Sequence, residues 1–244
     1  MALLTHDYYC PKIGMASELH LLVPDEILRG EEQAAGTLFL LPPQGESGLS
    51  LLTGTKISAL SEAYRIAVVV PPALQGCFTD MVYGYPFYQS LKYVREYLKT
   101  YLPGLPVEKG CCAVAGLGIS AIAALRFAAE EPDFFACAGS IAGILDPSIR
   151  PQGYFTESRL TDLFGTEEER IEKREAFFTA CGASETRKVF LFSEEEDLGF
   201  ESTKKAAEIF GNRAVLRLSD SPITLKACSD ALGKFVEYWI GGTC

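Results

Sequence analysis

The sequence predicts an α/β fold with a mostly parallel, doubly wound central sheet flanked by helices. Strand-like and helix-like segments alternate along most of the 244 residues, as they do where crossover helices join parallel strands. Several strand-like segments, such as residues 66–70 (IAVVV), are apolar at every position, which is typical of strands covered on both faces. A third observation is the stretch 111–125, in which an apolar run meets a glycine-rich corner and then an alanine-rich run.

The strands are predicted from short segments whose apolar residues either alternate with polar ones or run unbroken. The first of them alternates in part and ends at Pro24, which indicates an edge strand. The chain before it, including His6, looks unstructured. Strands are expected over residues 17–23, 37–41, 66–70, 111–115, 134–140, 189–192 and 214–218.

Helices are predicted where apolar residues recur three and four positions apart. Residues 86–102 give the clearest pattern, with Phe87, Leu91, Val94 and Leu98 on one face. A strongly charged segment begins at Thr166, a residue type that caps helices, and reads as a solvated helix. Helices are expected over residues 55–64, 86–102, 166–174, 202–210 and 225–240 and from Ser120 onward, with residues 146–165 as an irregular excursion.

The composition suits one α/β domain spanning residues 1–244 and excludes several functions. A formal net charge of −10 argues against binding to nucleic acid or to an anionic membrane, because both require a basic surface. No apolar stretch approaches the ~20 residues of a membrane helix, and no signal peptide precedes Tyr8. The eight cysteines lack metal-binding spacing, so we expect reduced thiols, no metal or cofactor, and a cytoplasmic protein.

The corner at residues 116–121 (GLGISA) has the shape of a nucleophile elbow. In such an elbow the serine of G-x-S-x-G lies on a strained turn between a strand and a helix. Here the nucleophile position is Gly118, which has no side chain. Glycine adopts positive φ without the roughly 1–3 kcal/mol of strain that another residue would carry. The sequence therefore predicts that the turn is present without a nucleophile at its tip.

Further motifs make the chain resemble the esterase D and tributyrin esterase branch of the α/β-hydrolases, which act on short acyl esters. Residues 78–85 (FTDMVYGY) resemble the family's Y-T-D-x-x-Y-G segment, and residues 115–117 with Ala124 and Leu125 resemble its A-G-L-S-M-G-G…A-L elbow. Residues 140–143 (SIAG) resemble its S-x-S-G strand end. The resemblance covers nearly the whole chain and implies the α/β-hydrolase fold.

The departures from the family fall on its working positions. Family members carry L-L-H-G where residues 40–43 read LLPP, and the nucleophile serine is replaced by Gly118. The acid of the family's E-D pair is matched by Asp197, and the histidine position falls at Ser221. No histidine follows His20 anywhere in the chain. Because a hydroxyl nucleophile needs a base within reach, the resemblance implies an esterase homologue without a working triad.

Two functions remain open on these grounds. The first is a catalytically inactive pseudo-esterase that binds a small-molecule ligand or a protein partner and that can form a homo-oligomer. The alternative is a carboxylic ester hydrolase that uses Ser120 as a displaced nucleophile, although a serine there is more often a helix cap. Asp197 is either a remnant of the triad or a structural residue of its loop.

The binding pocket is expected above the corner. Residues 42–48 form a loop after the carboxyl end of a strand, where ligands bind in open α/β sheets. The backbone N–H of Ile119 opens a helix and is a donor for an anion or a carbonyl oxygen. The expected lining is Pro43, Gln44, Phe78, Asp80, Tyr83, Tyr85 and Ile119.

Overall fold

The computed structural model describes residues 1–72, 76–101, 111–151 and 155–242. Its strands are β1 (Ala2–Cys10), β2 (Met15–Val23), β3 (Gly36–Leu41), β4 (Ile66–Val70), β5 (Cys111–Leu117), β6 (Phe135–Ile141), β7 (Val189–Ser193) and β8 (Ala214–Leu218). They form one eight-stranded sheet in the order β1-β2-β4-β3-β5-β6-β7-β8. Strands β3 to β8 run parallel to one another, and β2 is antiparallel to both β1 and β4. The predicted mostly parallel sheet is confirmed.

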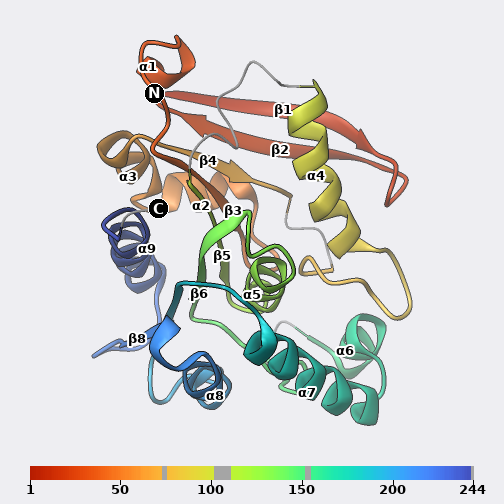
Figure 1. Ribbon diagram of the computed structural model, residues 1–244. Helices are drawn as coiled ribbons and strands as arrows, with labels where there is room; N and C mark the ends of the chain where they lie inside the picture. Colours follow the sequence, from red (N-terminus) through yellow and green to blue (C-terminus); the bar gives the residue numbers. More distant parts are fainter. Residues whose placement is uncertain (73–75, 102–110, 152–154, 243–244) are drawn as a thin grey trace.

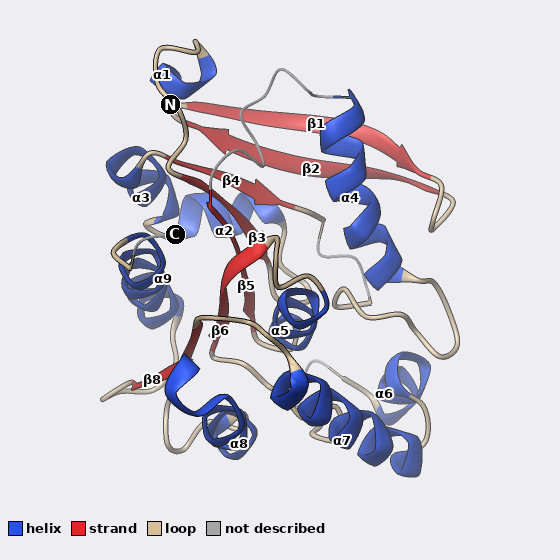
Figure 2. Ribbon diagram, viewed as in Figure 1, coloured by secondary structure: helices blue, strands red, loops and turns tan. Residues whose placement is uncertain are grey.

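Helices cover both faces of this sheet (Figures 1 and 2). One face carries α4 (Phe87–Tyr101), α5 (Ser120–Glu130), α6 (Glu157–Phe164), α7 (Glu167–Ala183) and α8 (Phe200–Phe210). The other face carries α2 (Gly48–Gly54), α3 (Ile57–Tyr64) and α9 (Leu225–Ile240). The short helix α1 (Asp25–Leu28) and a 3-10 turn, Gly211–Arg213, complete the described elements. The layers follow from the right-handed crossovers that parallel strands require.

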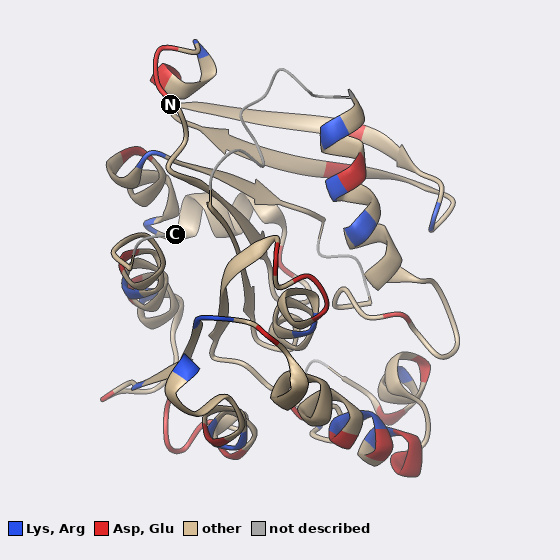
Figure 3. Cartoon of the chain, in the orientation of Figure 1, with Lys and Arg blue, Asp and Glu red and all other residues tan. Residues whose placement is uncertain are grey.

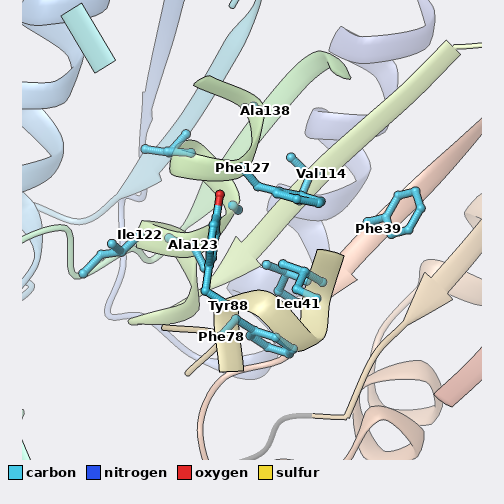
Figure 4. Packing of buried hydrophobic residues seen from close by; sticks show 14 of the residues in the cluster. Phe39, Leu41, Phe78, Tyr88, Val114, Ile122, Ala123, Phe127 and Ala138 are labelled. Carbon is cyan, nitrogen blue, oxygen red and sulfur yellow. The ribbon is translucent and has the colours of Figure 1, made fainter. Parts of the chain in front are cut away.

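The hydrophobic core consists of two clusters, one on each face of the sheet, and successive residues of the central strands point alternately into one and the other. On β3, Phe39 and Leu41 face the cluster under α4 and α5, whereas Leu38 and Leu40 face the cluster under α3 and α9. Figure 4 shows the first cluster, in which Tyr88 of α4 and Phe127 of α5 lie over the sheet. Every residue of β3 is buried, which explains why this strand reads as an unbroken apolar run.

Charged side chains lie on the outer helices, while β3, β4, β5 and β6 carry none (Figure 3). On α7 the predicted cap is confirmed, because the Thr166 hydroxyl accepts a bond from the Glu169 N–H and the Glu169 carboxylate accepts one from the Thr166 N–H. This capping box fixes where the helix begins. Among the described residues, no helix is long and apolar enough to cross a membrane.

The structure corrects several element assignments. The start of the chain forms β1, so β2 is not an edge strand; the polar residues Thr5, His6 and Asp7 in its middle conceal the strand pattern. Helix α2 and helix α6 were not predicted, and α7 extends nine residues past residue 174. Residue 102, the expected last residue of α4, lies outside the described range.

The cysteines largely follow the expectation of reduced thiols. Those described as free are all buried: Cys10, Cys77, Cys112, Cys137, Cys181 and Cys228. Cys111 is the exception to that expectation, because it is disulfide-bonded.

Candidate functional site

The corner after β5 is a tight strand-to-helix turn, as predicted. β5 ends at Leu117 and α5 begins at Ser120, so Gly118 and Ile119 make the connection. Gly118 has φ +57, which is the left-handed region that glycine adopts without strain. Its N–H donates to the Ile141 carbonyl oxygen (3.1 Å), and its carbonyl accepts from the Ile144 N–H (3.2 Å). The turn is therefore held to the end of β6 by backbone bonds on both sides.

The two glycines of the corner have different surroundings. A Cβ at Gly116 would lie 2.4 Å from the Ser120 carbonyl oxygen and 2.6 Å from the Ala121 nitrogen, so the absence of a side chain lets α5 pack directly against β5. A Cβ at Gly118 would meet only the Pro43 Cβ, at 3.7 Å. This is ordinary van der Waals contact. The tip of the turn thus faces open space.

That space is a cavity of about 220 Å³ above the turn. It lies where β3 and β5 end, at the carboxyl edge of the parallel strands, which is the usual ligand position in such sheets. Its walls are mostly apolar. The lining residues are Pro43, Gln44, Glu46, Gly118, Ile119, Ile144, Pro151 and Phe155.

Two of the residues that line the cavity have unused backbone donors. The N–H groups of Gln44 and Ile119 donate to no acceptor among the described residues. Ile119 immediately precedes α5, an eleven-residue helix, so its N–H lies at the positive end of the helix dipole. Donors of this kind bind an anion or the oxygen of a polarised carbonyl.

The Gln44 side chain is held by a buried thiol. The Cys77 Sγ–H donates to Gln44 Oε1 at 3.3 Å. Burial raises the pKa of Cys77 to about 12, which keeps this thiol protonated and able to donate. Cys77 and Phe78 both have positive φ (50 and 56), an uncommon conformation for residues other than glycine. The Gln44 side-chain amide also carries two N–H donors, for which no acceptor is present among the described residues.

Ser120 is turned away from the cavity. Its hydroxyl donates to the Pro42 carbonyl oxygen at 2.8 Å, and the residue is 1% exposed. In the corner motif it occupies the position of the second glycine of G-x-S-x-G. The side chain therefore ties the start of α5 to the loop after β3.

Asp197 and Ser221 lie in loops at the carboxyl ends of β7 and β8. Asp197 is half-buried, and its Oδ2 accepts a bond from the Gly199 N–H at 3.3 Å. Burial raises the pKa of Asp197, an effect that its backbone hydrogen bonds partly offset. Asp197 is close enough to Cys228 on α9 to add to the rise in that thiol's pKa, which is caused mainly by burial. Ser221 is exposed, and neither Asp197 nor Ser221 lines the cavity.

Both histidines lie on the antiparallel pair β1–β2. His6 Nε2 is 2.9 Å from the Tyr97 hydroxyl. His20 is buried, with Nδ1 3.1 Å from the Thr5 hydroxyl and Nε2 3.1 Å from Glu18 Oε1. In the sheet, β4 and β3 separate the strand of His20 from β5.

The structure brings together only part of the expected pocket. Pro43, Gln44 and Ile119 line the cavity with Gly118. The other expected residues do not line it. Phe78 is buried in the core; Asp80 accepts bonds from the Tyr88 and Gln89 N–H groups at the start of α4; Tyr83 and Tyr85 are exposed.

The remaining lining residues were not anticipated individually. Glu46 belongs to the loop of residues 42–48, whose place after a strand end does predict a ligand position. Pro151 and Phe155 come from the stretch of residues 146–165, which was interpreted as an irregular excursion, and Ile144 lies two residues before it. The part of that stretch before α6 has no periodic pattern, so its sequence contains no signal that it folds back over the corner.

Comparisons with known proteins identify the fold to which this architecture belongs. No protein-family model matches the sequence, and no curated protein matches it. Solved structures do: the Staphylococcus aureus fluorophosphonate-binding serine hydrolase F is 15% identical, with a TM-score of 0.78 over 98% of both chains. An S-formylglutathione hydrolase from Agrobacterium tumefaciens is 12% identical, with a TM-score of 0.76 over 97% of this chain and 95% of that one.

A ferulic acid esterase is also similar, with 13% identity and a TM-score of 0.75 over 98% of this chain and 97% of that one. At such identities the likeness establishes architecture, since one fold hosts many functions. The eight-stranded mixed sheet and the flanking helices agree with these structures. The chain has the α/β-hydrolase fold and is similar in structure to esterases and other serine hydrolases.

Proposed function

We propose that this protein is a catalytically inactive member of the esterase-like α/β-hydrolases that binds a small carbonyl compound above Gly118. One observation carries the proposal. The position where hydrolases of this fold hold their nucleophile is a glycine at φ +57, next to a cavity bordered by the unused N–H donors of Gln44 and Ile119.

The chemistry of acyl transfer supports the absence of turnover. A hydroxyl nucleophile is weak at neutral pH and needs an adjacent base. Gly118 has no side chain, and the two histidines of the sequence lie on β1 and β2. An acid that orients an imidazolium has a lowered pKa, whereas burial raises the pKa of Asp197. Asp197 therefore behaves as an acid without a cationic partner.

The cavity supports binding. Its two backbone donors suit a carbonyl oxygen, and they need no catalytic serine to do so. Ile144, Pro151 and Phe155 supply an apolar wall for the rest of the ligand. Small-ligand sites commonly combine a mostly apolar lining with a few convergent polar groups.

The alternative, ester hydrolysis by Ser120, has less support. The Ser120 hydroxyl is buried and donates its proton to the Pro42 carbonyl oxygen. A backbone carbonyl accepts a hydrogen bond but does not act as a general base at neutral pH. Attack on a substrate in the cavity would require the side chain to leave this bond and turn toward Gly118.

Two measurements on the purified protein test the proposal. We expect hydrolysis of p-nitrophenyl acetate at the buffer rate and no labelling by a fluorophosphonate probe. In ¹H–¹⁵N spectra, titration with a small ester should shift the amide signals of Gln44 and Ile119. Hydrolysis well above the buffer rate that Ser120→Ala abolishes would replace this proposal with the alternative.

A matched pair of variants checks where the ester binds. Gly118→Trp should remove the shifts, because the indole would fill the cavity. Gly30→Trp is the control: Gly30 also has positive φ (74), and nothing lies within 4 Å of a Cβ there. It should leave the shifts unchanged. Equal binding by the Gly118→Trp variant would place the ligand elsewhere and contradict the proposal.

We also propose a cytoplasmic location and self-association into a homo-oligomer. The net charge of −10 supports a partner other than nucleic acid or membrane lipid. Among the described strands, β1 has a neighbour on one side only, and its residues Leu3 and Tyr9 are exposed. Such edges pair readily with another chain. Cell fractionation and light scattering test these two points.

A further inference from the structure

Among the described residues that line the cavity, Glu46 alone has an ionisable side chain. It is exposed, and its Oε2 accepts a bond from the Ser50 hydroxyl at 2.7 Å. Within the described part of the chain it has no ion-pair partner. A carboxylate without a cationic partner therefore stands at the wall of the cavity that also holds the Gln44 and Ile119 donors.

An aromatic ring lines the same cavity. Phe155 is buried, and with Pro43, Ile144 and Pro151 it makes the lining predominantly apolar. An aromatic face attracts cations, and quaternary ammonium groups are recognised by such rings. A carboxylate and an aromatic ring at one small cavity are together suited to an alkylammonium group.

The electrostatics also disfavour one class of ligand. Two N–H donors alone would bind a free carboxylate as readily as a carbonyl oxygen. In a cavity of about 220 Å³, however, a carboxylate bound to these donors would lie close to Glu46, and like charges at short range repel. A neutral acyl oxygen avoids this repulsion.

From these contacts we infer that the ligand is a small ester or amide whose alcohol or amine part carries a positive charge. Its acyl oxygen binds the Gln44 and Ile119 N–H groups, and its cationic group lies between Glu46 and Phe155. This inference rests on the proposed binding function and adds the ligand's charge. It involves no covalent step.

The test uses three probes that differ in charge. Acetylcholine is an acetyl ester with a quaternary ammonium group, 3,3-dimethylbutyl acetate is its neutral carbon isostere, and acetate carries only the carboxylate. Dissociation constants come from the amide shifts of Gln44 and Ile119 in ¹H–¹⁵N spectra. We expect acetylcholine to bind at least about fivefold more tightly than the isostere, and acetate to bind most weakly.

Two variants test whether Glu46 and Phe155 cause the preference for acetylcholine over its neutral isostere. Glu46→Gln keeps an acceptor for Ser50 and removes the charge, so the affinities for acetylcholine and its isostere should become equal within about twofold. Glu172→Gln is the control, because it removes one negative charge from an exposed position on α7. It should leave the preference intact. Phe155→Leu should reduce the preference while the isostere still binds.

The outcomes separate this inference from the proposed function. Binding of both esters with equal affinity, or tighter binding of acetate, would overturn the inferred charge and leave carbonyl binding in place. A preference that survives Glu46→Gln would overturn the role of Glu46. If no probe shifts either amide, both the inference and the proposed function fail.

Discussion

The Ser120 hydroxyl donates a hydrogen bond to the Pro42 carbonyl oxygen at 2.8 Å. The bond joins the first residue of α5 to the loop after β3, the two segments that supply the Ile119 and Gln44 donors. Both partners are buried. The hydroxyl that the alternative function needs as a nucleophile therefore links the two segments that carry these donors.

Ser120→Ala should lower the free energy of unfolding by about 1–3 kcal/mol, because the buried Pro42 carbonyl would lose its donor. Urea unfolding checks this value. Ser158→Ala is a suitable control, since Ser158 is exposed on α6, and it should change stability by less than about 0.5 kcal/mol. Equal stability of the two variants would show that the hydroxyl does not support the loop.

The corner glycines should respond differently to alanine. Gly116→Ala forces a Cβ to within 2.4 Å of a backbone oxygen of α5, so the helix must shift and we expect a loss of about 3 kcal/mol or more. Gly118→Ala meets only ordinary contact, and its positive φ should cost about 1–2 kcal/mol. Urea unfolding of both variants tests the order.

Gly30→Ala is the reference for the effect of backbone conformation alone. Its φ is +74, and no atom lies within 4 Å of the added Cβ. Gly30→Ala should lower the free energy of unfolding by about as much as Gly118→Ala does. A loss for Gly118→Ala that matched that of Gly116→Ala would mean that the tip of the turn is closed, contrary to the cavity described here.

The central strands and the corner could be predicted from the sequence because their signals are local. Strands β3 and β4 are unbroken apolar runs, and a glycine pair marks the turn after β5. β1 was missed because its pattern depends on distant partners: the inward-facing His6 bonds to Tyr97, ninety-one residues away. No local periodicity reports such a pair.

The pocket residues next to strand ends could be predicted from the sequence, whereas those in the longer loops could not. Residues next to strand ends, such as Gln44 and Ile119, must lie near the corner whatever the loops do. The segment 78–85 instead packs on neighbouring helices, because Asp80 caps α4 and the Tyr83 N–H donates to the Asp162 carbonyl of α6. Phe155 reaches the cavity through a loop whose path depends on tertiary contacts.

Asp197→Asn should stabilise the protein at neutral pH and have no effect in acid. Burial raises the pKa of Asp197 in the folded state, so the folded protein holds this proton more tightly than the unfolded chain does. The stability that the protonated carboxyl contributes is fully present when the pH is below the pKa of Asp197 in the unfolded chain. It is lost as the pH rises through the higher pKa of the folded state. Asparagine stays neutral and still offers an oxygen to the Gly199 N–H.

Urea unfolding of both proteins across pH 3 to 8 measures this difference. The two curves should coincide at the acid end and separate as the pH rises, with the variant more stable. Because Asp197 is only half-buried, solvent screening keeps the separation small. A wild-type protein that gained stability over the variant with rising pH would indicate a cationic partner for Asp197.

Substitutions at Gly118 distinguish access to the corner from activation of a nucleophile there. Gly118→Ser and Gly118→Cys both place a small side chain where only the Pro43 Cβ lies nearby, at 3.7 Å, and each should lower stability by about 1–2 kcal/mol through positive φ. A cysteine is partly ionised near neutral pH without help from a base, whereas a serine is not. We therefore expect iodoacetamide to modify Gly118→Cys at residue 118, detected by peptide mass spectrometry, while a fluorophosphonate leaves Gly118→Ser unlabelled.

The free cysteines described in the wild-type protein are buried and serve as internal controls in the same digest. Labelling of Gly118→Ser would reveal a base near the turn and contradict the proposed catalytic inactivity. Failure to modify Gly118→Cys would show that the cavity is closed to small molecules.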